Sequence, residues 1–302
     1  MHVVPKSKVV ILDSNISNED SNYNQFIPGH TYSLNEEVQY GEDIFRSLKD
    51  NNTKIPIALK TSLDWKFLKK ANKWAAFDEE TSSLTTFETE IIYVVEARYI
   101  DCIALLNLKA RKVRFELFNI ADDISTSEPI WSDEQITFSR KPYNYTEYII
   151  SDGVFSKTIL QDIFPYYGVK LKITISNTPG SMVEIGNIIY GKKIDLGITL
   201  TGVALEIGNL LDIDIDKETG FISQVPILTR KDLTIPVLID IKDFERVEQK
   251  FTELLGIPCL FIAFNSVKNI RPSLAIYGFY KTIRIPIAAE KNEYEIQIKG
   301  VI

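Results

Sequence analysis

Alternation of hydrophobic and polar residues is strongest between Asn72 and Phe118. The run at residues 112–118 reads KVRFELF, which places apolar and charged side chains on opposite faces of an extended chain. A period of two residues is typical of a strand with one buried face. Two runs rich in β-branched and aromatic residues precede it, at residues 90–95 and 102–106. The pattern predicts three strands here, and we expect the chain to be organised around them.

Short strand-like runs continue to about Leu196, with Pro, Gly, Asn or Asp in the turns between them. They occupy residues 135–138, 145–150, 169–176 and 182–189. Many short strands with such turns and almost no helical periodicity favour an antiparallel sandwich. We therefore expect a central β-sandwich over residues 72–197.

The last third of the chain contains the strongest helical pattern. Residues 242–255, KDFERVEQKFTELL, carry apolar residues on one helical face, and Gly256 is a stop signal. The residues of that face are Phe244, Val247, Phe251, Leu254 and Leu255. Strand-like runs surround the helix, including one at residues 233–239 that holds Pro236 and therefore suits a sheet edge or bulge. Residues 198–302 thus read as an α+β domain with one main helix on an antiparallel sheet.

Two smaller segments precede the sandwich. Residues 1–22 predict one strand at residues 8–12, added to a neighbouring sheet, followed by a polar linker; a frayed terminus is the alternative. Residues 23–71 predict a small β module with a hairpin turn at Gly41. The fold class is therefore mainly β and multidomain.

Charge and composition argue against several classes of function. The net charge of −7 over 302 residues is spread without a basic block, which argues against nucleic-acid binding. No apolar run reaches the ~20 residues of a membrane span, and no signal peptide is seen, so we expect synthesis in the cytoplasm. Cys102 and Cys259 lie in apolar runs and are expected to be buried free thiols.

Candidate catalytic groups are sparse. His2 and His30 are both poor candidates for a catalytic base, and two histidines exclude a His-rich zinc site. The acidic run from Asp212 to Asp216 lacks the Gly and Glu of a calcium loop, and alternation with Ile favours a strand with one wet face. We therefore expect a chain that is not an enzyme and uses no cofactor or metal.

The small module carries an ordered set of aromatics, from Tyr32 through Val38-Gln-Tyr40-Gly41 to Phe45, Pro56 and Trp65. It resembles the small carbohydrate-binding modules of chitinases and related hydrolases, and similar units occur as spacers in phage tail proteins. That resemblance implies sugar contacts from Tyr40 and Trp65. The aromatic pair that the family exposes after its second strand is Leu48-Lys49 here, which favours a core role for these aromatics instead.

The central segment runs from Asn72-x-Trp74-x-x-Phe-Asp78 through IALLN at residues 103–107 to VEIGNIIYG at residues 183–191. It resembles the discoidin-like or galactose-binding jelly roll, and more closely the version in virion proteins of tailed bacteriophages. In sugar-binding jelly rolls, end loops hold the ligand or calcium, which implies a site at Asp78, Glu79 and Thr81. A solvated acidic turn is the alternative.

The two resemblances together imply a structural component of a tailed phage particle, in the tail or tail tip. Its expected partners are other tail proteins, further copies of itself and a host-surface glycan, and its expected location is the virion tail after synthesis in the host cytoplasm. The chain would mediate assembly and attach to a receptor or fibre. The alternative is a carbohydrate-binding protein that uses the jelly-roll loops.

Overall fold

The computed structural model describes residues 1–57, 62–139, 144–146, 154–215, 222–263, 274–284, 286 and 291–301. Within these residues the chain is mainly β and multidomain, and all named strand pairs except β3–β4 are antiparallel. One helix packs on a sheet near the C-terminal end. The predicted fold class is therefore confirmed.

The small domain is a four-stranded sheet ordered β3-β4-β5-β6. Its strands are β3 (Asn24–Gln25), β4 (Glu37–Tyr40), β5 (Asp43–Ser47) and β6 (Trp65–Lys70). Tyr40 pairs with Asp43, and Gly41 takes a φ of +64° in the tight turn between them, so the predicted hairpin is confirmed. The core of this sheet consists of Phe26, Tyr32, Val38, Phe45 and Trp65.

The central domain is a β-sandwich built around two long strands. Its elements are α1 (Asn72–Ala75), β7 (Thr85–Glu88), β8 (Glu90–Leu106), β9 (Lys112–Asn119), β10 (Trp131–Ile136), β11 (Phe138–Ser139), β12 (Val154–Phe155), β13 (Thr158–Ser176), β14 (Met182–Ile185) and β15 (Asn187–Gly191). The main sheet has the order β10-β9-β13-β8-β15. Residues 90–95 and 102–106 are therefore parts of one strand, where the sequence pattern predicts two.

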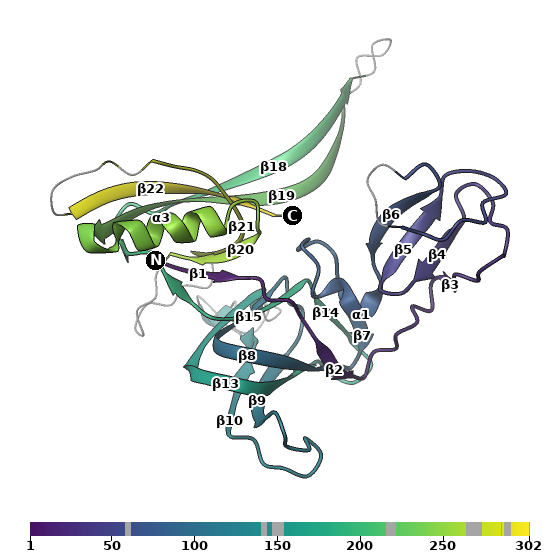
Figure 1. Ribbon diagram of the computed structural model, residues 1–302, viewed down its shortest axis with the longest axis horizontal. Coiled ribbons are helices and arrows are strands. Elements are labelled where there is room, and N and C mark those ends of the chain that lie inside the picture. Colours follow the sequence, from purple (N-terminus) through teal and green to yellow (C-terminus); the bar gives the residue numbers. More distant parts are fainter. Residues whose placement is uncertain are drawn as a thin grey trace.

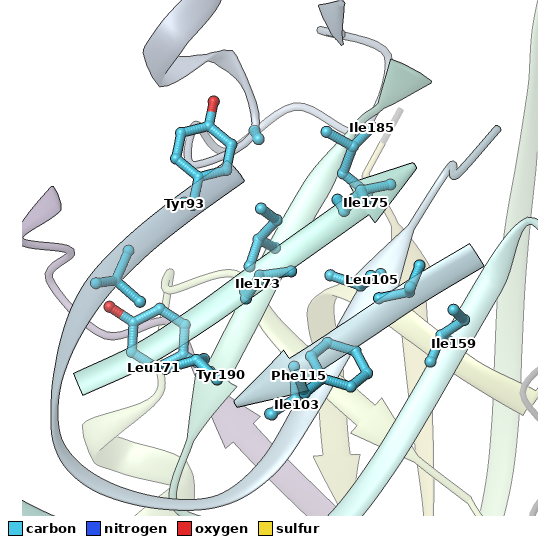
Figure 2. Close-up of a cluster of buried hydrophobic side chains, with 14 of the residues drawn as sticks. Tyr93, Ile103, Leu105, Phe115, Ile159, Leu171, Ile173, Ile175, Ile185 and Tyr190 are labelled. Atoms are coloured by element: carbon cyan, nitrogen blue, oxygen red, sulfur yellow. The ribbon is translucent and has the colours of Figure 1, made fainter. Parts of the chain in front are cut away.

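Strand β8 pairs with different strands along its length. Residues 102–106 of β8 pair with β15, whereas residues 93–95 pair with β2 (Ile11–Ser14). Apolar side chains from both ends of β8 lie in one core, in which Tyr93, Phe115 and Ile173 are fully buried (Figure 2). Cys102 is a buried free thiol in this domain, and Cys259 is one in the next, as predicted.

The C-terminal domain contains an eight-stranded sheet and the helix. Its elements are β16 (Ile194–Asp195), β17 (Ile198–Thr199), β18 (Ala204–Ile215), β19 (Ile222–Asp240), η1 (Ile241–Asp243), α3 (Phe244–Glu253), β20 (Cys259–Ile262), β21 (Ala275–Arg284) and β22 (Lys291–Gly300). Val247, Phe251 and Leu254 are buried against the sheet. Leu255 is 70 % exposed, contrary to its predicted place on the buried face, because the helix ends before it and Gly256 turns the chain at a φ of +73°.

The N-terminal segment joins the two larger domains. The strand predicted at residues 8–12 lies at Ile11–Ser14 as β2, and a further strand, β1 (His2–Pro5), was not predicted. Strand β1 lies between β16 and β20 in the C-terminal sheet, while β2 pairs with β8 of the sandwich (Figure 1). Successive β1 side chains point to opposite faces, so Val3 enters the core under the helix and Val4 enters a core shared with the sandwich.

Strands β18 and β19 form a long hairpin arm. Beyond the rest of the sheet the two strands continue together, away from the central sandwich (Figure 1). The sequence pattern predicts separate strands at residues 203–207 and 210–215, where the structure has the single strand β18. The sequence also predicts a turn at residues 216–220, which lies outside the described residues. Most of the strand predicted at residues 145–150 lies outside them as well, and the side chains of Asp212 and Asp214 are not described.

Candidate functional site

Residues 78–83 form a loop between α1 and β7, at the end of the sandwich that faces the C-terminal domain. The Asp78 carboxylate accepts a hydrogen bond from the backbone N–H of Glu80, at 2.9 Å. Two asparagine side chains hold the loop from the strands behind it: Asn187 donates to the carbonyl of Glu80 at 2.8 Å, and Asn107 donates to the carbonyl of Thr81 at 3.0 Å. The loop is therefore held by hydrogen bonds from within its own domain.

Lys6 reaches this loop from the N-terminal segment. Its ammonium donates to the carbonyl of Asp78 and lies 5.9 Å from the centre of the Tyr277 ring. Burial lowers the pKa of Lys6 to about 8, although the charges of Asp78 and Glu79 act in the opposite direction. The loop, the N-terminal segment and the C-terminal sheet thus meet around one partly buried cation.

The Asp78 carboxyl is also perturbed. Burial raises its pKa to about 6, and hydrogen bonds from Ser83 and from the backbone of Glu80 counteract part of that shift. Burial likewise raises the pKa of Tyr277, whose hydroxyl has no hydrogen-bond partner among the described residues. Carboxyl, ammonium and phenol groups therefore gather at this junction with altered proton affinities, a feature common at functional sites and also found in structural networks.

A cleft of about 450 Å³ opens beside the loop, between the two domains. Thr81, Asn107 and Lys157 line it from the sandwich, and Lys231, Tyr277 and Val301 line it from the C-terminal domain. The Thr81 hydroxyl donates to the carbonyl of Val301 at 3.0 Å and so spans the cleft. One lysine therefore lines the cleft from each domain, Lys157 from the sandwich and Lys231 from the C-terminal sheet.

The predicted site residues divide between two domains. Asp78, Glu79 and Thr81 lie together in the loop, where Glu79 is exposed and the other two are half-buried. Trp65 is only 1 % exposed, and its indole N–H donates to the carbonyl of Lys54 at 2.7 Å. Tyr40 is 44 % exposed and packs edge-on against Phe26. Trp65 is therefore inaccessible to a sugar, whereas Tyr40 remains partly exposed.

Several residues of the junction cannot be identified from local sequence. Lys6, Lys157, Lys231, Tyr277 and Val301 come from five separate segments of the chain. Outside the junction, the sequence does show one unusual pattern. The aromatic run FPYYG at residues 164–168 interrupts an otherwise alternating strand. The structure exposes part of that run at a bulge of β13.

Across the described ranges, no three or more His, Cys, Asp or Glu side chains are grouped so that they could hold a metal ion. No helix in the described part of the chain is long and apolar enough to cross a bilayer. Comparison with protein-family models, curated proteins and solved structures found no match to this chain.

Proposed function

We propose that the chain is a structural, non-enzymatic component of a tailed phage particle, located in the tail or tail tip, and that the β18–β19 arm is the element through which it assembles. The phage setting rests on the sequence resemblances of the small module and the central sandwich. The structural role rests on the geometry of the arm, which can be tested on the isolated chain.

The arm leaves two strand edges open. Among the described residues, the stretch 222–231 of β19 pairs with β18 alone, and β22 joins β19 from Asp232 onward. In the described part of the sheet, β18 has β19 as its single neighbour. At ~3.3 Å per residue, the open stretch is about 30 Å long. Unpaired N–H and C=O groups along such edges are templates for pairing with another chain.

The base of the arm is firmly anchored. Strand β19 continues into the centre of the sheet, where Leu233, Ile235 and Val237 are buried. The N-terminal strands β1 and β2 join that sheet to the sandwich. The arm is therefore attached to two joined domains, and a neighbouring subunit that pairs with it would be positioned relative to both. This arrangement suits an assembly with other copies of the chain or with other tail proteins.

The test is the mass of the purified chain, measured by light scattering over a range of concentrations. We expect a homo-oligomer that is lost when residues 210–228 are replaced by an Asn-Gly turn between Asn209 and Thr229. A milder variant is Ile207→Lys, which places a charge on β18 where the native side chain is 60 % exposed. Lysine on an edge strand opposes pairing with a second strand.

A matched control is Ile136→Lys in β10, the edge strand of the sandwich, where the native side chain is 74 % exposed. This variant should keep the mass of the parent chain. Unchanged circular dichroism in all variants would show that folding is not the cause of any loss. A full chain that stays monomeric at every soluble concentration, and that is absent from purified particles, would overturn the proposal.

A further inference from the structure

Strand β13 contains a bulge that carries an exposed aromatic residue. Its register with β8 shifts between Asp162 and Tyr166. Within the shifted segment Ile163 is 8 % exposed and packs in the core, whereas the neighbouring Phe164 is 82 % exposed. Pro165 follows, and as a proline it has no backbone N–H that would otherwise pair with the neighbouring strand. Bulges re-aim side chains, and they occur preferentially beside functional sites.

A second aromatic group stands next to the bulge. Tyr167 of β13 is directly opposite Tyr99 of β8, and their rings pack edge-to-face with centres 4.6 Å apart. Tyr167 is 74 % exposed, whereas Tyr166 before it packs against the core. Phe164 and Tyr167 are therefore two exposed rings three residues apart in β13, one inside the bulge and one just after it.

The supporting ring is held in place by polar contacts. The Tyr99 hydroxyl donates to Asp101 at 3.1 Å, and the other oxygen of Asp101 accepts from the backbone N–H of Lys193 at 2.7 Å. The Lys192 ammonium lies 5.4 Å from the centre of the Tyr99 ring. Tyr99 is thus fixed from its edge and from one face, and it in turn orients Tyr167.

We propose that this aromatic corner, formed by Tyr99, Phe164, Tyr167 and Lys192, is a binding site for an oligosaccharide. Exposed aromatic rings stack on the C–H-rich faces of pyranose rings. The Tyr167 hydroxyl and the Lys192 ammonium lie beside the rings and can hydrogen-bond to sugar hydroxyls. Because the bulge and Asp101 order the corner in advance, a ligand loses little binding energy in organising it.

The size and charge of the corner favour a sugar over a protein partner. A stable protein interface buries about 800 Å² on each side and is depleted of charged residues at its centre. Here the two exposed rings have charged neighbours, the Lys193–Asp162 ion pair at 3.1 Å and the exposed Lys192 beside Tyr99. Two aromatic side chains can bury about 300–500 Å² together, which is less than a stable protein interface needs and suits a ligand of one or two sugar rings. The site goes beyond the assembly role of the β18–β19 arm and supplies the chain with an attachment function.

The experiment is a screen of the full chain on an array of bacterial surface and peptidoglycan oligosaccharides, followed by calorimetric titration of the strongest glycan. We expect Phe164→Ala and Tyr167→Ala each to weaken that binding by about tenfold or more, since each removes one stacked ring. Tyr167→Phe keeps the ring and should retain most of the affinity. Both native side chains are highly exposed, so these variants should fold normally.

Tyr145 is 79 % exposed and provides the matched control, because Tyr145→Ala removes an equally exposed ring elsewhere. Glycan binding that survives both Phe164→Ala and Tyr167→Ala would overturn the proposal, as would an array without any bound glycan. If these variants instead change the mass of the oligomer, the corner is a protein contact and the sugar assignment is wrong. Ile207→Lys separates the two ideas, since it should disrupt assembly and leave glycan binding intact.

Discussion

The hydroxyl of Thr81 donates a hydrogen bond to the carbonyl of Val301 across 220 positions of sequence, at 3.0 Å. This contact joins an end loop of the central sandwich to the last described residue of the C-terminal domain. Val301 is held from its other side as well, because its N–H donates to the carbonyl of Tyr277. The predicted loop site is therefore part of a junction between two domains, and its behaviour should depend on both.

Removing this hydroxyl should loosen the junction. We expect Thr81→Val to lower the free energy of unfolding by about 1 kcal/mol, since a half-buried carbonyl loses its partner. Thr81→Ser keeps the donor and should lose much less. Urea denaturation of the three proteins gives the comparison, and equal midpoints for Thr81→Val and the parent chain would contradict the role assigned to this bond.

Asp78 should make folding depend on pH. Its pKa rises from 3.8 to about 6 in the folded chain, so the folded state binds a proton that the unfolded state has released. The stability contributed by this group is full below about pH 4 and is lost as the pH rises through about 6. Asp78→Asn should remove that fall, measured as a smaller decrease in the unfolding free energy over this pH range. Glu80→Gln removes a neighbouring exposed charge and should leave the decrease in place.

Val4 should be important for holding the two larger domains together. It is fully buried in the core that β1 shares with the sandwich, next to Cys102 and Leu260. Val4→Ala removes two methyl groups and should cost about 2 kcal/mol of stability. Val10, in the same N-terminal segment but 46 % exposed, is the matched control. A cost for Val10→Ala equal to that for Val4→Ala would show that burial at the junction is not the cause.

Substitutions of Trp65 and Tyr40 should show which of these two aromatic residues supports the fold of the small domain and which is free to bind a ligand. Trp65→Ala should destabilise that domain by roughly 3–5 kcal/mol, because a fully buried indole is removed. Hydrogen exchange of the β4 and β5 amides should then become much faster. Tyr40→Ala should change this exchange little, since Tyr40 is 44 % exposed. Fast exchange in both variants would assign Tyr40 to the core as well.

Local pattern was sufficient for much of the fold. Alternation at residues 112–118 indicated β9, the apolar face at residues 242–255 indicated the helix, and Gly41 marked a hairpin. Each of these signals depends on side chains within a few residues of one another, which is the range over which period and turn chemistry act. The loop at Asp78, Glu79 and Thr81 was also visible as a cluster in the sequence.

What the loop touches was decided by the tertiary structure. Residues 1–5 carry no strong strand pattern, yet β1 lies inside the C-terminal sheet because its partners β16 and β20 supply the hydrogen bonds. Lys6 then reaches Asp78, and Val301 reaches Thr81, through contacts between distant segments. Local sequence determined the mainly β character, the helix and the Asp78–Thr81 loop of this protein. The junction, the projecting arm and the aromatic corner were fixed only by long-range strand pairing and burial, which local periodicity does not encode.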